Sequence, residues 1–319
     1  MKISMQLRPD FTDEDLTFAR QLGVDYVSVS TTGGTYDLFA TVKARVEAAG
    51  LMLANIGNSH VHNMPEVTLN LPGRDEKIGQ YKEYLRSLGR LGIDYTTYAH
   101  MGNGIWSSAR ETTRGDASAR HVDLDTAHGY WGGEEFVPPL THGRRYSEDE
   151  LWDNYTYFIR QVAPVAEEVG VRIGMHPDDP PAVELGGVPR CVLGTYDGYV
   201  RALEIADSPN VGVCLCMGTW LEGGDLMGRS VDDAARAFAG LGKLWKVHFR
   251  NVSAPLPTFT ETFVDDGYAD MRTLMRTLVA VDFDGILIAD HVPQMVGDGR
   301  TAWAYSLGYI KALRDMAVS

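Results

Sequence analysis

The sequence is poor in cysteine, and its few cysteines are badly placed for disulfides. Its 319 residues include three cysteines, at positions 191, 214 and 216. Three cysteines cannot all pair, and Cys214 and Cys216 lie two residues apart on what reads as one strand. We therefore expect a reducing, cytoplasmic setting.

Long apolar runs are also missing. No run approaches the roughly 18 residues that a membrane-spanning helix needs. The first ten residues, MKISMQLRPD, contain no apolar segment of the kind found in signal peptides. We expect neither a signal peptide nor a membrane partner.

Basic clusters are absent as well. The formal net charge is −14, and no run of lysine or arginine occurs. A nucleic-acid partner would require a basic face, so we expect none. Acidic surfaces are common on soluble enzymes, and the charge by itself indicates nothing more.

What the sequence does contain is a regular alternation of two patterns. Short β-rich runs are found at Ile3–Leu7, Asp25–Ser30, Leu51–Ile56, Asp94–His100, Val171–His176, Val211–Cys216, Lys246–Phe249 and Ile286–Asp290. Amphipathic helical patterns lie between them, at Asp13–Leu22, Asp37–Ala49, Glu76–Leu91, Glu148–Val169, Tyr196–Ala206, Val231–Leu241, Tyr268–Val281 and Trp303–Met316. Eight such units predict an α/β fold, a single (β/α)₈ TIM barrel, with residues 1–319 forming one domain.

Local signals support these boundaries. Ser147 and Glu150 have the spacing of a capping box that opens the helix at Glu148–Val169. Gly23, Gly50 and Gly170 each follow a predicted helix, where a glycine commonly ends it.

The connection between the fourth strand and its helix is much longer than the others in this alternation. Residues 101–146 separate the fourth strand from its helix and contain Trp106 and Trp131. Loops of this length tend to be functional, and a βα loop lies at the catalytic end of a barrel. We expect this insertion to be a lid over the site or a contact between subunits, and the two roles are compatible.

Residues typical of metal sites end the later strands. The fifth, sixth, seventh and eighth strands end at His176, Cys216, His248 and Asp290. Chemistry in a barrel collects at these ends, and imidazole, thiolate and carboxylate bind Mn, Fe or Zn. Any one of them alone would more often be a structural residue, but four on successive strands predict one metal site. Cys214 has the same strand parity and could also face inward.

Polar neighbours of these residues suggest substrate contacts. Asp178 and Asp179 follow His176 and could orient imidazoles or hold substrate hydroxyls, or form a solvated turn. Arg250, two residues after His248 and beside Asn251, could clamp a carboxylate or form a structural salt bridge. We place Asp178, Arg250 and Asn251 among the candidate substrate-binding residues.

Several motifs make the sequence similar to the mannonate dehydratase family. They are HPDDPP at 176–181, CMGT at 216–219, HFRN at 248–251, FTETFVDDGYADM at 259–271, DHVPQM at 290–295 and a segment that contains Tyr305. The resemblance extends over nearly the whole chain. It implies a barrel that binds Mn²⁺ or Fe²⁺ through the same four residues reached from the strand ends.

The resemblance also implies an activity. A dehydratase of this family removes water from D-mannonate or a related sugar acid and yields a 2-keto-3-deoxy acid. The family's acid/base pair corresponds to His291 and Tyr305. A divalent cation would stabilise the charge that develops when the C2 proton leaves. His60, His62 and His100 are candidates for binding sugar hydroxyls, although each could equally be a satisfied loop histidine.

The sequence departs from the family around the last strand. The family usually has Arg-Pro-Asp-His, whereas this chain has Ile288 and Ala289 before Asp290. Val292 and Pro293 stand where the family tends to have Gly and a second His. The metal ligands are kept and the substrate contacts have changed, so a related sugar acid is a further possible substrate.

Two other functions remain open. A sugar isomerase or epimerase abstracts protons in a similar way, and a barrel can also bind a sugar acid without catalysis. The presence of His291 beside Asp290 argues against mere binding. We expect a small-molecule sugar acid as substrate and a homo-oligomeric assembly.

Overall fold

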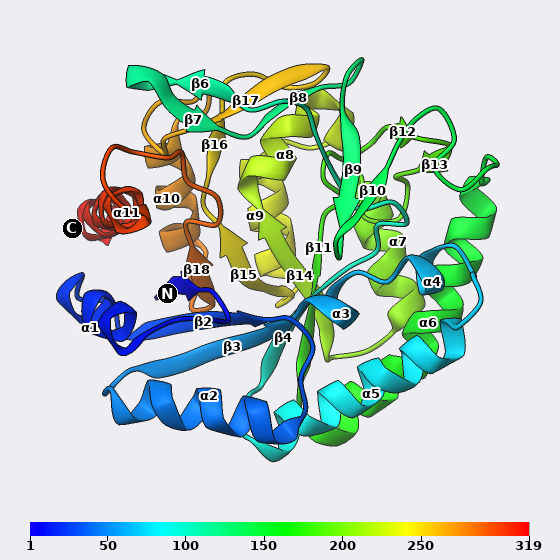
Figure 1. The fold of residues 1–319 in the computed structure, drawn as a ribbon, viewed down its shortest axis with the longest axis horizontal. Coiled ribbons are helices and arrows are strands. Elements are labelled where there is room, and N and C mark those ends of the chain that lie inside the picture. Colours follow the sequence, from blue (N-terminus) through cyan, green and yellow to red (C-terminus); the bar gives the residue numbers. More distant parts are fainter. Residues whose placement is uncertain (319) are drawn as a thin grey trace.

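Eight parallel strands form a nearly closed barrel in the computed structural model, which describes residues 1–318 (Figure 1). The strands are β1 (Lys2–Leu7), β2 (Tyr26–Thr31), β3 (Met52–Asn58), β4 (Tyr95–Ala99), β11 (Arg172–His176), β14 (Val211–Cys216), β15 (Leu244–His248) and β18 (Ile286–Ile288). They follow the order β3-β2-β1-β18-β15-β14-β11-β4, and β3 and β4 lie side by side. The predicted barrel is confirmed.

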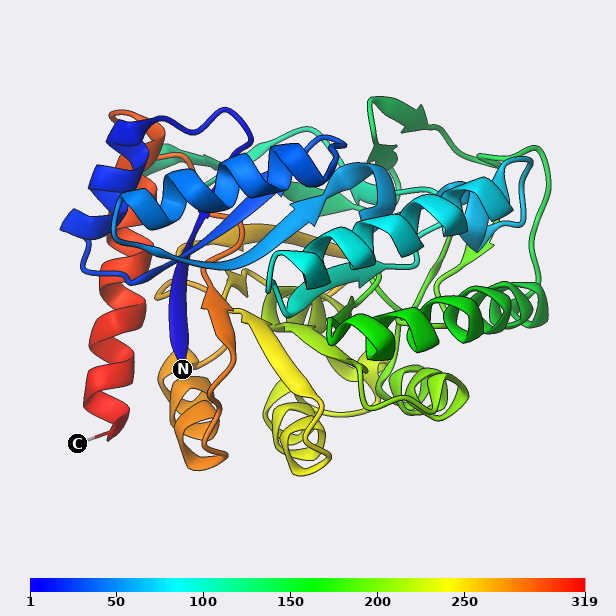
Figure 2. The ribbon, with the colours of Figure 1, turned by 90° about the horizontal axis from the view of Figure 1, so that it is seen from below.

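Helices surround the strands. They are α1 (Asp13–Gln21), α2 (Tyr36–Ala48), α5 (Arg74–Arg90), α6 (Glu148–Val169), α7 (Tyr196–Ala206), α9 (Val231–Gly240), α10 (Met271–Ala280) and α11 (Gly299–Val318). The C-terminal helix α11 lies beside α1 (Figure 2), where Arg300 contacts Glu14 and Asp15. No helix of residues 1–318 is long and apolar enough to cross a membrane.

The predicted helix signals are confirmed in the backbone. The Ser147 hydroxyl accepts from the Glu150 amide at 3.2 Å, and the Glu150 carboxylate accepts from the Ser147 amide at 2.8 Å. Both bonds satisfy amides that would otherwise lack a partner at the start of α6. Gly170 ends α6 with φ 68°, a conformation that side chains with a Cβ rarely adopt.

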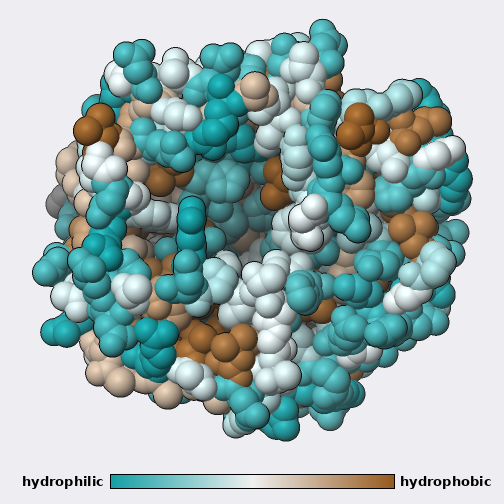
Figure 3. Space-filling view, viewed as in Figure 1, coloured by the Kyte–Doolittle hydropathy of each residue, from teal (hydrophilic) through white to brown (hydrophobic). Residues whose placement is uncertain are grey.

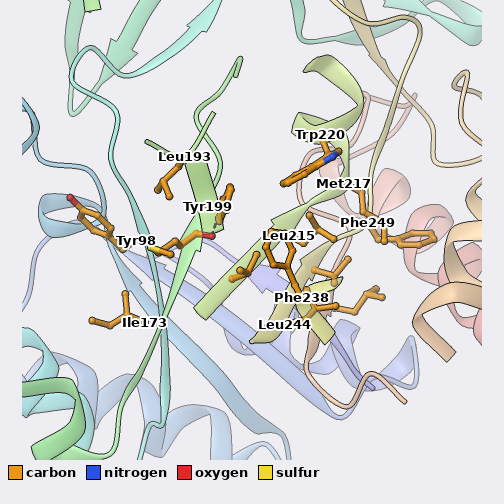
Figure 4. Close-up of a cluster of buried hydrophobic side chains, with 14 of the residues drawn as sticks. Tyr98, Ile173, Leu193, Tyr199, Leu215, Met217, Trp220, Phe238, Leu244 and Phe249 are labelled. Carbon is orange, nitrogen blue, oxygen red and sulfur yellow. Dashed lines mark hydrogen bonds between the residues drawn. The ribbon is translucent and has the colours of Figure 1, made fainter. Parts of the chain in front are cut away.

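Aromatic side chains fill the space between the barrel and its helices (Figure 4). Phe238 of α9 lies 5.5 Å from Tyr199 of α7 and 5.9 Å from Trp220, measured between ring centroids. All are buried, as is Leu215 on the neighbouring strand β14. Each such side chain contributes about 1.5–3 kcal/mol by leaving water, so this cluster holds β14 in place.

The insertion after β4 is folded rather than structureless. It contains β5 (Ile105–Ser107), β6 (Glu111–Thr113), η1 (Arg114–Asp116), β7 (Ala117–Ala119), β8 (His121–Asp123), β9 (His128–Trp131) and β10 (Glu134–Phe136). Strands β5, β9 and β10 form one small sheet, and β8 pairs with β17 (Thr258–Thr262) after the seventh barrel strand. The insertion therefore joins two distant loops above the barrel mouth (Figure 1).

Further short elements occupy the other loops at this end. They are α3 (Ser59–His62), α4 (Pro65–Thr68), β12 (Glu184–Leu185), β13 (Val188–Pro189), α8 (Met217–Gly223), η2 (Gly224–Met227) and β16 (Asn251–Val252). None was predicted from the sequence. The last barrel strand is also shorter than expected, because β18 ends at Ile288 and not at Asp290.

Candidate metal centre and active site

A cavity of about 210 Å³ opens at the barrel mouth. The space-filling view shows a depression with a mainly hydrophilic floor near the centre of this face (Figure 3). One side of the cavity is lined by the ends of β11, β15 and the segment after β18, and the other side by polar residues of β1 to β4. Three candidate metal ligands, His176, His248 and Asp290, thus border the same space as this polar wall.

Three of the predicted ligands converge. The ligand atoms of His176, Cys216 and His248 all lie within 4.8 Å of one another. Nδ1–H of His176 donates to the carbonyl of Pro177 at 2.7 Å, which leaves Nε2 as the lone-pair nitrogen. Nδ1 of His248 is buried and makes no hydrogen bond. A buried nitrogen that makes no hydrogen bond, beside a thiol and a second imidazole, fits a transition-metal ion.

Asp290, the fourth candidate, lies beside this group in the segment after β18. Its Oδ1 lies 3.3 Å from Nδ1 of His248, and its Oδ2 lies 3.9 Å from Sγ of Cys216. Its φ of 65° is in the left-handed region, which aspartate tolerates better than most residues. In this conformation the carboxylate lies near His248 and Cys216 although the strand has already ended.

The two neighbouring cysteines have different partners. Sγ of Cys216 accepts from the amide and hydroxyl of Thr219 at 3.4 and 3.2 Å. Burial opposes ionisation of Cys216, but Arg250, His176 and His248 hold its pKa well below the usual range. Sγ of Cys214 instead lies 3.4 Å from Nε2 of His248, on the far side of that ring from Asp290. Cys216 is therefore the cysteine with the surroundings of a metal ligand.

The guanidinium of Arg250 is bound by carboxylates of the protein and is not free for a substrate. Its guanidinium donates to Asp290 at 3.1 Å, to Glu222 at 2.7 Å and to Asp179 at 3.2 Å, and its side chain is 1% exposed. A Cβ on Gly218 would lie 2.3 Å from Cγ of Arg250, so the glycine is needed for this packing. The structure places Arg250 in a buried ion network and outside the cavity, as in the salt-bridge alternative.

A second arginine enters this network from the insertion. Arg120 contacts Asp179, Glu222 and Glu261, and its side chain is buried. Burial raises the pKa of Glu222 to about 8, and the nearby Asp179 adds to this shift. In Glu261, burial is outweighed by His291 and the two arginines, which bring its pKa to about 2. The network fixes the insertion to the barrel mouth.

His291 lies at the edge of this network and borders the cavity. Its Nδ1–H donates to Glu261 at 2.7 Å, so Nε2 is the nitrogen available for proton transfer. Burial opposes its charge, but Asp290 and Glu261 outweigh it and raise its pKa to about 9 in the metal-free chain. A carboxylate that orients an imidazole beside a metal site is suited to acid–base chemistry.

Tyr305 does not join His291. Its hydroxyl accepts from Arg114 at 3.2 Å, and its ring packs against Phe263 with centroids 5.6 Å apart. It is not among the residues that line the cavity. Tyr305 thus anchors α11 to the insertion in this structure, because α11 presents it to Arg114.

The three loop histidines are separated. His62 lines the cavity, stacks on Trp131 and donates from Nδ1 to the carbonyl of Thr97 at 3.0 Å. Burial lowers the pKa of His62 to about 3, so it stays neutral with Nε2 as an acceptor. His100 is buried against Tyr98, with 2.7 Å between Nδ1 and the tyrosine hydroxyl. His60, within α3, is exposed and lines a separate hollow bordered by α2 and α5.

Two other candidates also lie outside the cavity. Asp178 is buried, its amide donates to Leu193, and burial raises its pKa to about 6. Asn251 donates to the carbonyls of Val264 and Ala269 and so fixes the loop after β15. Neither is placed to touch a ligand in the cavity, which is bordered by Asp179 instead.

Comparison with known proteins decides the family. The model of the D-mannonate dehydratase family matches residues 32–128 and 134–317. The chain belongs to this family. A mannonate dehydratase of Streptococcus equi subsp. zooepidemicus is 30% identical over 294 residues, which cover 85% of this chain and 78% of that protein. Mannonate dehydratase 2 of Halalkalibacterium halodurans is 29% identical over 282 residues, covering 82% and 78% of the two chains.

Solved structures agree on the fold of this mannonate dehydratase family member. The mannonate dehydratase from Streptococcus suis serotype 2 matches with a TM-score of 0.85 and 24% identity, covering 100% of this chain and 93% of that chain. The 3-keto-D-glucoside 4-epimerase of E. coli matches with a TM-score of 0.63 and 16% identity, covering 98% and 99% of the two chains. Such distant likenesses show the shared barrel, and the predicted family is confirmed by the sequence matches.

The sequence patterns missed several cavity residues of this family member. Lys246, Asn55 and Trp131 line the cavity but end no barrel strand. The signal for Lys246 was present, because a lysine in an apolar strand, two residues before His248, has the same inward parity. Burial lowers the pKa of Lys246, and Cys214 and Asp290 oppose this shift.

Proposed function

We propose that this protein is a metal-dependent dehydratase that converts D-mannonate, or a closely related aldonate, to a 2-keto-3-deoxy acid. The observation that carries the proposal is His291, held by Glu261 at 2.7 Å and lining the same cavity as His176, His248 and Asp290. We assign His176, Cys216, His248 and Asp290 to the metal, with Mn²⁺ or Fe²⁺ as the expected ion. Membership of the family supports the substrate class.

The reaction requires loss of the C2 proton and of the C3 hydroxyl, which leave together as water. The resulting enol then becomes the 2-keto acid. The bound cation would act as a Lewis acid on the substrate's oxygen atoms. His291 would transfer a proton at Nε2, while Glu261 keeps the ring in place through Nδ1. The buried Arg120 and Arg250 hold Glu261 and so fix the dyad.

The first test is direct. Purified protein with Mn²⁺ is expected to convert D-mannonate to a product that reacts as a 2-keto-3-deoxy acid. Chelation with EDTA should lower the rate by at least roughly 100-fold, because the Lewis acid that stabilises the charge formed at C2 is then lost. Mn²⁺ or Fe²⁺ should then restore the rate. Activity that survives complete metal removal would contradict the proposed mechanism.

An epimerase would behave differently in the same assay. In D₂O it would exchange a carbon-bound proton and keep the formula of its substrate, whereas a dehydratase loses water. Mass spectrometry of the product distinguishes the two reactions. A product of unchanged formula would replace the proposed function with epimerisation, and tight binding without turnover would indicate a sugar-acid binding protein.

We further propose that residues 101–146 cover the bound substrate. Met101, Ile105 and Trp131 from this insertion line the cavity. The Trp131 ring stacks on His62, with centroids 5.5 Å apart and 27° between the planes. A contact between subunits is compatible with this role, because Tyr130 next to Trp131 is 47% exposed.

Trp131→Ala is expected to raise KM for D-mannonate roughly tenfold, because it opens the cavity and removes an aromatic wall. Tyr130→Ala is the matched control and should leave KM unchanged, since its side chain points away from the cavity lining. Both are followed by steady-state kinetics and by sedimentation. Changes in oligomeric state without a change in KM would favour the contact role alone.

The setting and assembly are also proposals. The three cysteines form no disulfide, which supports a reducing, cytoplasmic location. We propose a homo-oligomer that takes a small sugar acid as its only substrate class, with residues 1–319 acting as one domain.

A further inference from the structure

Lys246 is a cation buried inside the barrel. It lies on β15 two residues before His248, so both side chains point to the barrel interior. Its side chain is 4% exposed and lines the cavity. The nearest bonded partner is Oδ1 of Asn55 on β3, 3.5 Å from Nζ. Lys246 therefore reaches across the barrel and forms part of the cavity floor.

The ammonium group has no carboxylate partner. Within residues 1–318, no aspartate or glutamate forms an ion pair with Lys246. Its single hydrogen bond is long, although an ammonium can donate three. Burying such a charge without a counter-ion costs several kcal/mol, and an apolar side chain of the same length would avoid that cost. Asp290 and Cys214 act on the ammonium group only through space, and neither forms an ion pair or hydrogen bond with it among residues 1–318.

The charges around the cavity point to its partner. Among the described lining residues, Lys246 is the one lysine or arginine. Arg250 and Arg120 are held in the ion network behind the cavity. Strand β18, next to β15, presents buried Ile286 and Ile288 and adds no cation. His291 also borders the cavity, but it is bonded to Glu261. A negatively charged ligand would therefore find its free cation at Lys246.

We propose that Lys246 binds the carboxylate of the sugar acid, with Asn55 orienting the ammonium group. This inference rests on the proposed function and names a substrate contact within it. The contact lies on the same strand face as His248, about 7 Å away along β15. A carboxylate held there has its neighbouring carbon atoms beside the metal ligands and His291. The ammonium would also stabilise the charge that builds up when the C2 proton leaves.

The test compares a charged ligand with an uncharged one. Binding is measured by calorimetry on Mn²⁺-loaded His291→Asn protein, in which the proposed function predicts turnover slowed by roughly 10²- to 10⁴-fold. Adding Lys246→Met should weaken D-mannonate binding roughly 10- to 100-fold, the effect of one charged hydrogen bond. Binding of D-mannitol, which has the same chain without the carboxylate, should change less than about twofold. Lys246→Arg should restore most of the difference.

Lys243→Met is the matched control. Lys243 begins the same stretch of chain, but its ammonium donates to the carbonyls of Ser208 and Val211 at the opposite end of the barrel. The Lys243→Met variant should bind D-mannonate and D-mannitol as tightly as the parent protein does. Circular dichroism melting and Mn²⁺ content are measured for every variant, and Lys246→Met should melt no lower than the parent, since it removes an unpaired buried charge.

Each result decides the inference. If Lys246→Met weakened the binding of D-mannonate and of D-mannitol equally and also lowered the melting midpoint, Lys246 would have a purely structural role. The inference would then be wrong. Unchanged affinity for D-mannonate would overturn it as well. Failure of the proposed function is distinguishable, because wild-type protein would then bind D-mannonate through Lys246 without dehydrating it. If Lys246→Met dehydrated D-mannonate with an unaltered KM, the role of Lys246 would be wrong while the proposed dehydratase function would stand.

Discussion

His291→Asn is expected to lower kcat for D-mannonate by roughly 10²- to 10⁴-fold, the usual contribution of one acid–base group. Asparagine keeps a polar side chain of similar reach but transfers no proton at neutral pH. His291 bonds to Glu261 and is not one of the three clustered residues that could hold a metal ion, so the variant should still bind one equivalent of metal. Steady-state kinetics and metal analysis on the same sample measure both quantities.

Tyr305→Phe is the informative companion variant. The structure places the Tyr305 hydroxyl against Arg114 and not in the cavity, so kcat should change less than about fivefold. A loss as large as that of His291→Asn would mean that Tyr305 acts on the substrate, as the family resemblance implies. Helix α11 and the insertion would then have to rearrange during the reaction. Loss of metal from His291→Asn would instead assign His291 to metal binding.

The barrel could be predicted because its signals are local. Periods of two and of 3.6 residues identify strands and helices, and eight repeats leave few other topologies. The helix α6 was predicted to the residue because Ser147 and Gly170 mark both ends. The strands of the insertion had no such signal. Each spans three or four residues, and β8 is stabilised by pairing with β17, far away in the sequence.

The convergence of the candidate metal ligands could be predicted because strand ends meet at one edge of a barrel. The partners of polar side chains could not. The sequence did not show which groups Arg250 contacts. The fold brings Asp179 and Glu222 to its guanidinium. Tyr305 was expected near His291, but the insertion supplies Arg114 and holds it elsewhere. Local sequence patterns therefore do not predict contacts that a long insertion makes with distant parts of the chain.

The two cysteines of β14 give the sharpest test of the metal centre. Cys216→Ala is expected to lower metal affinity by more than roughly 100-fold, beyond the effect typical of residues that only contact a ligand. Sγ of Cys216 belongs to the cluster with His176 and His248 and accepts two hydrogen bonds from Thr219. Activity should fall in parallel, because the catalytic chemistry depends on the ion.

Cys214→Ala and Cys191→Ala are its matched controls. Cys214 contacts Nε2 of His248, and a thiol is a weak hydrogen-bonding partner, so metal affinity should fall at most roughly tenfold. Cys191 lines a separate hollow beside Trp152 and should have no effect. Equilibrium dialysis with Mn²⁺ gives the three affinities. If Cys214→Ala caused the larger loss, the ligand would be Cys214, and β14 would have to bind the ion one step deeper in the barrel, because residues two apart on a strand share a face.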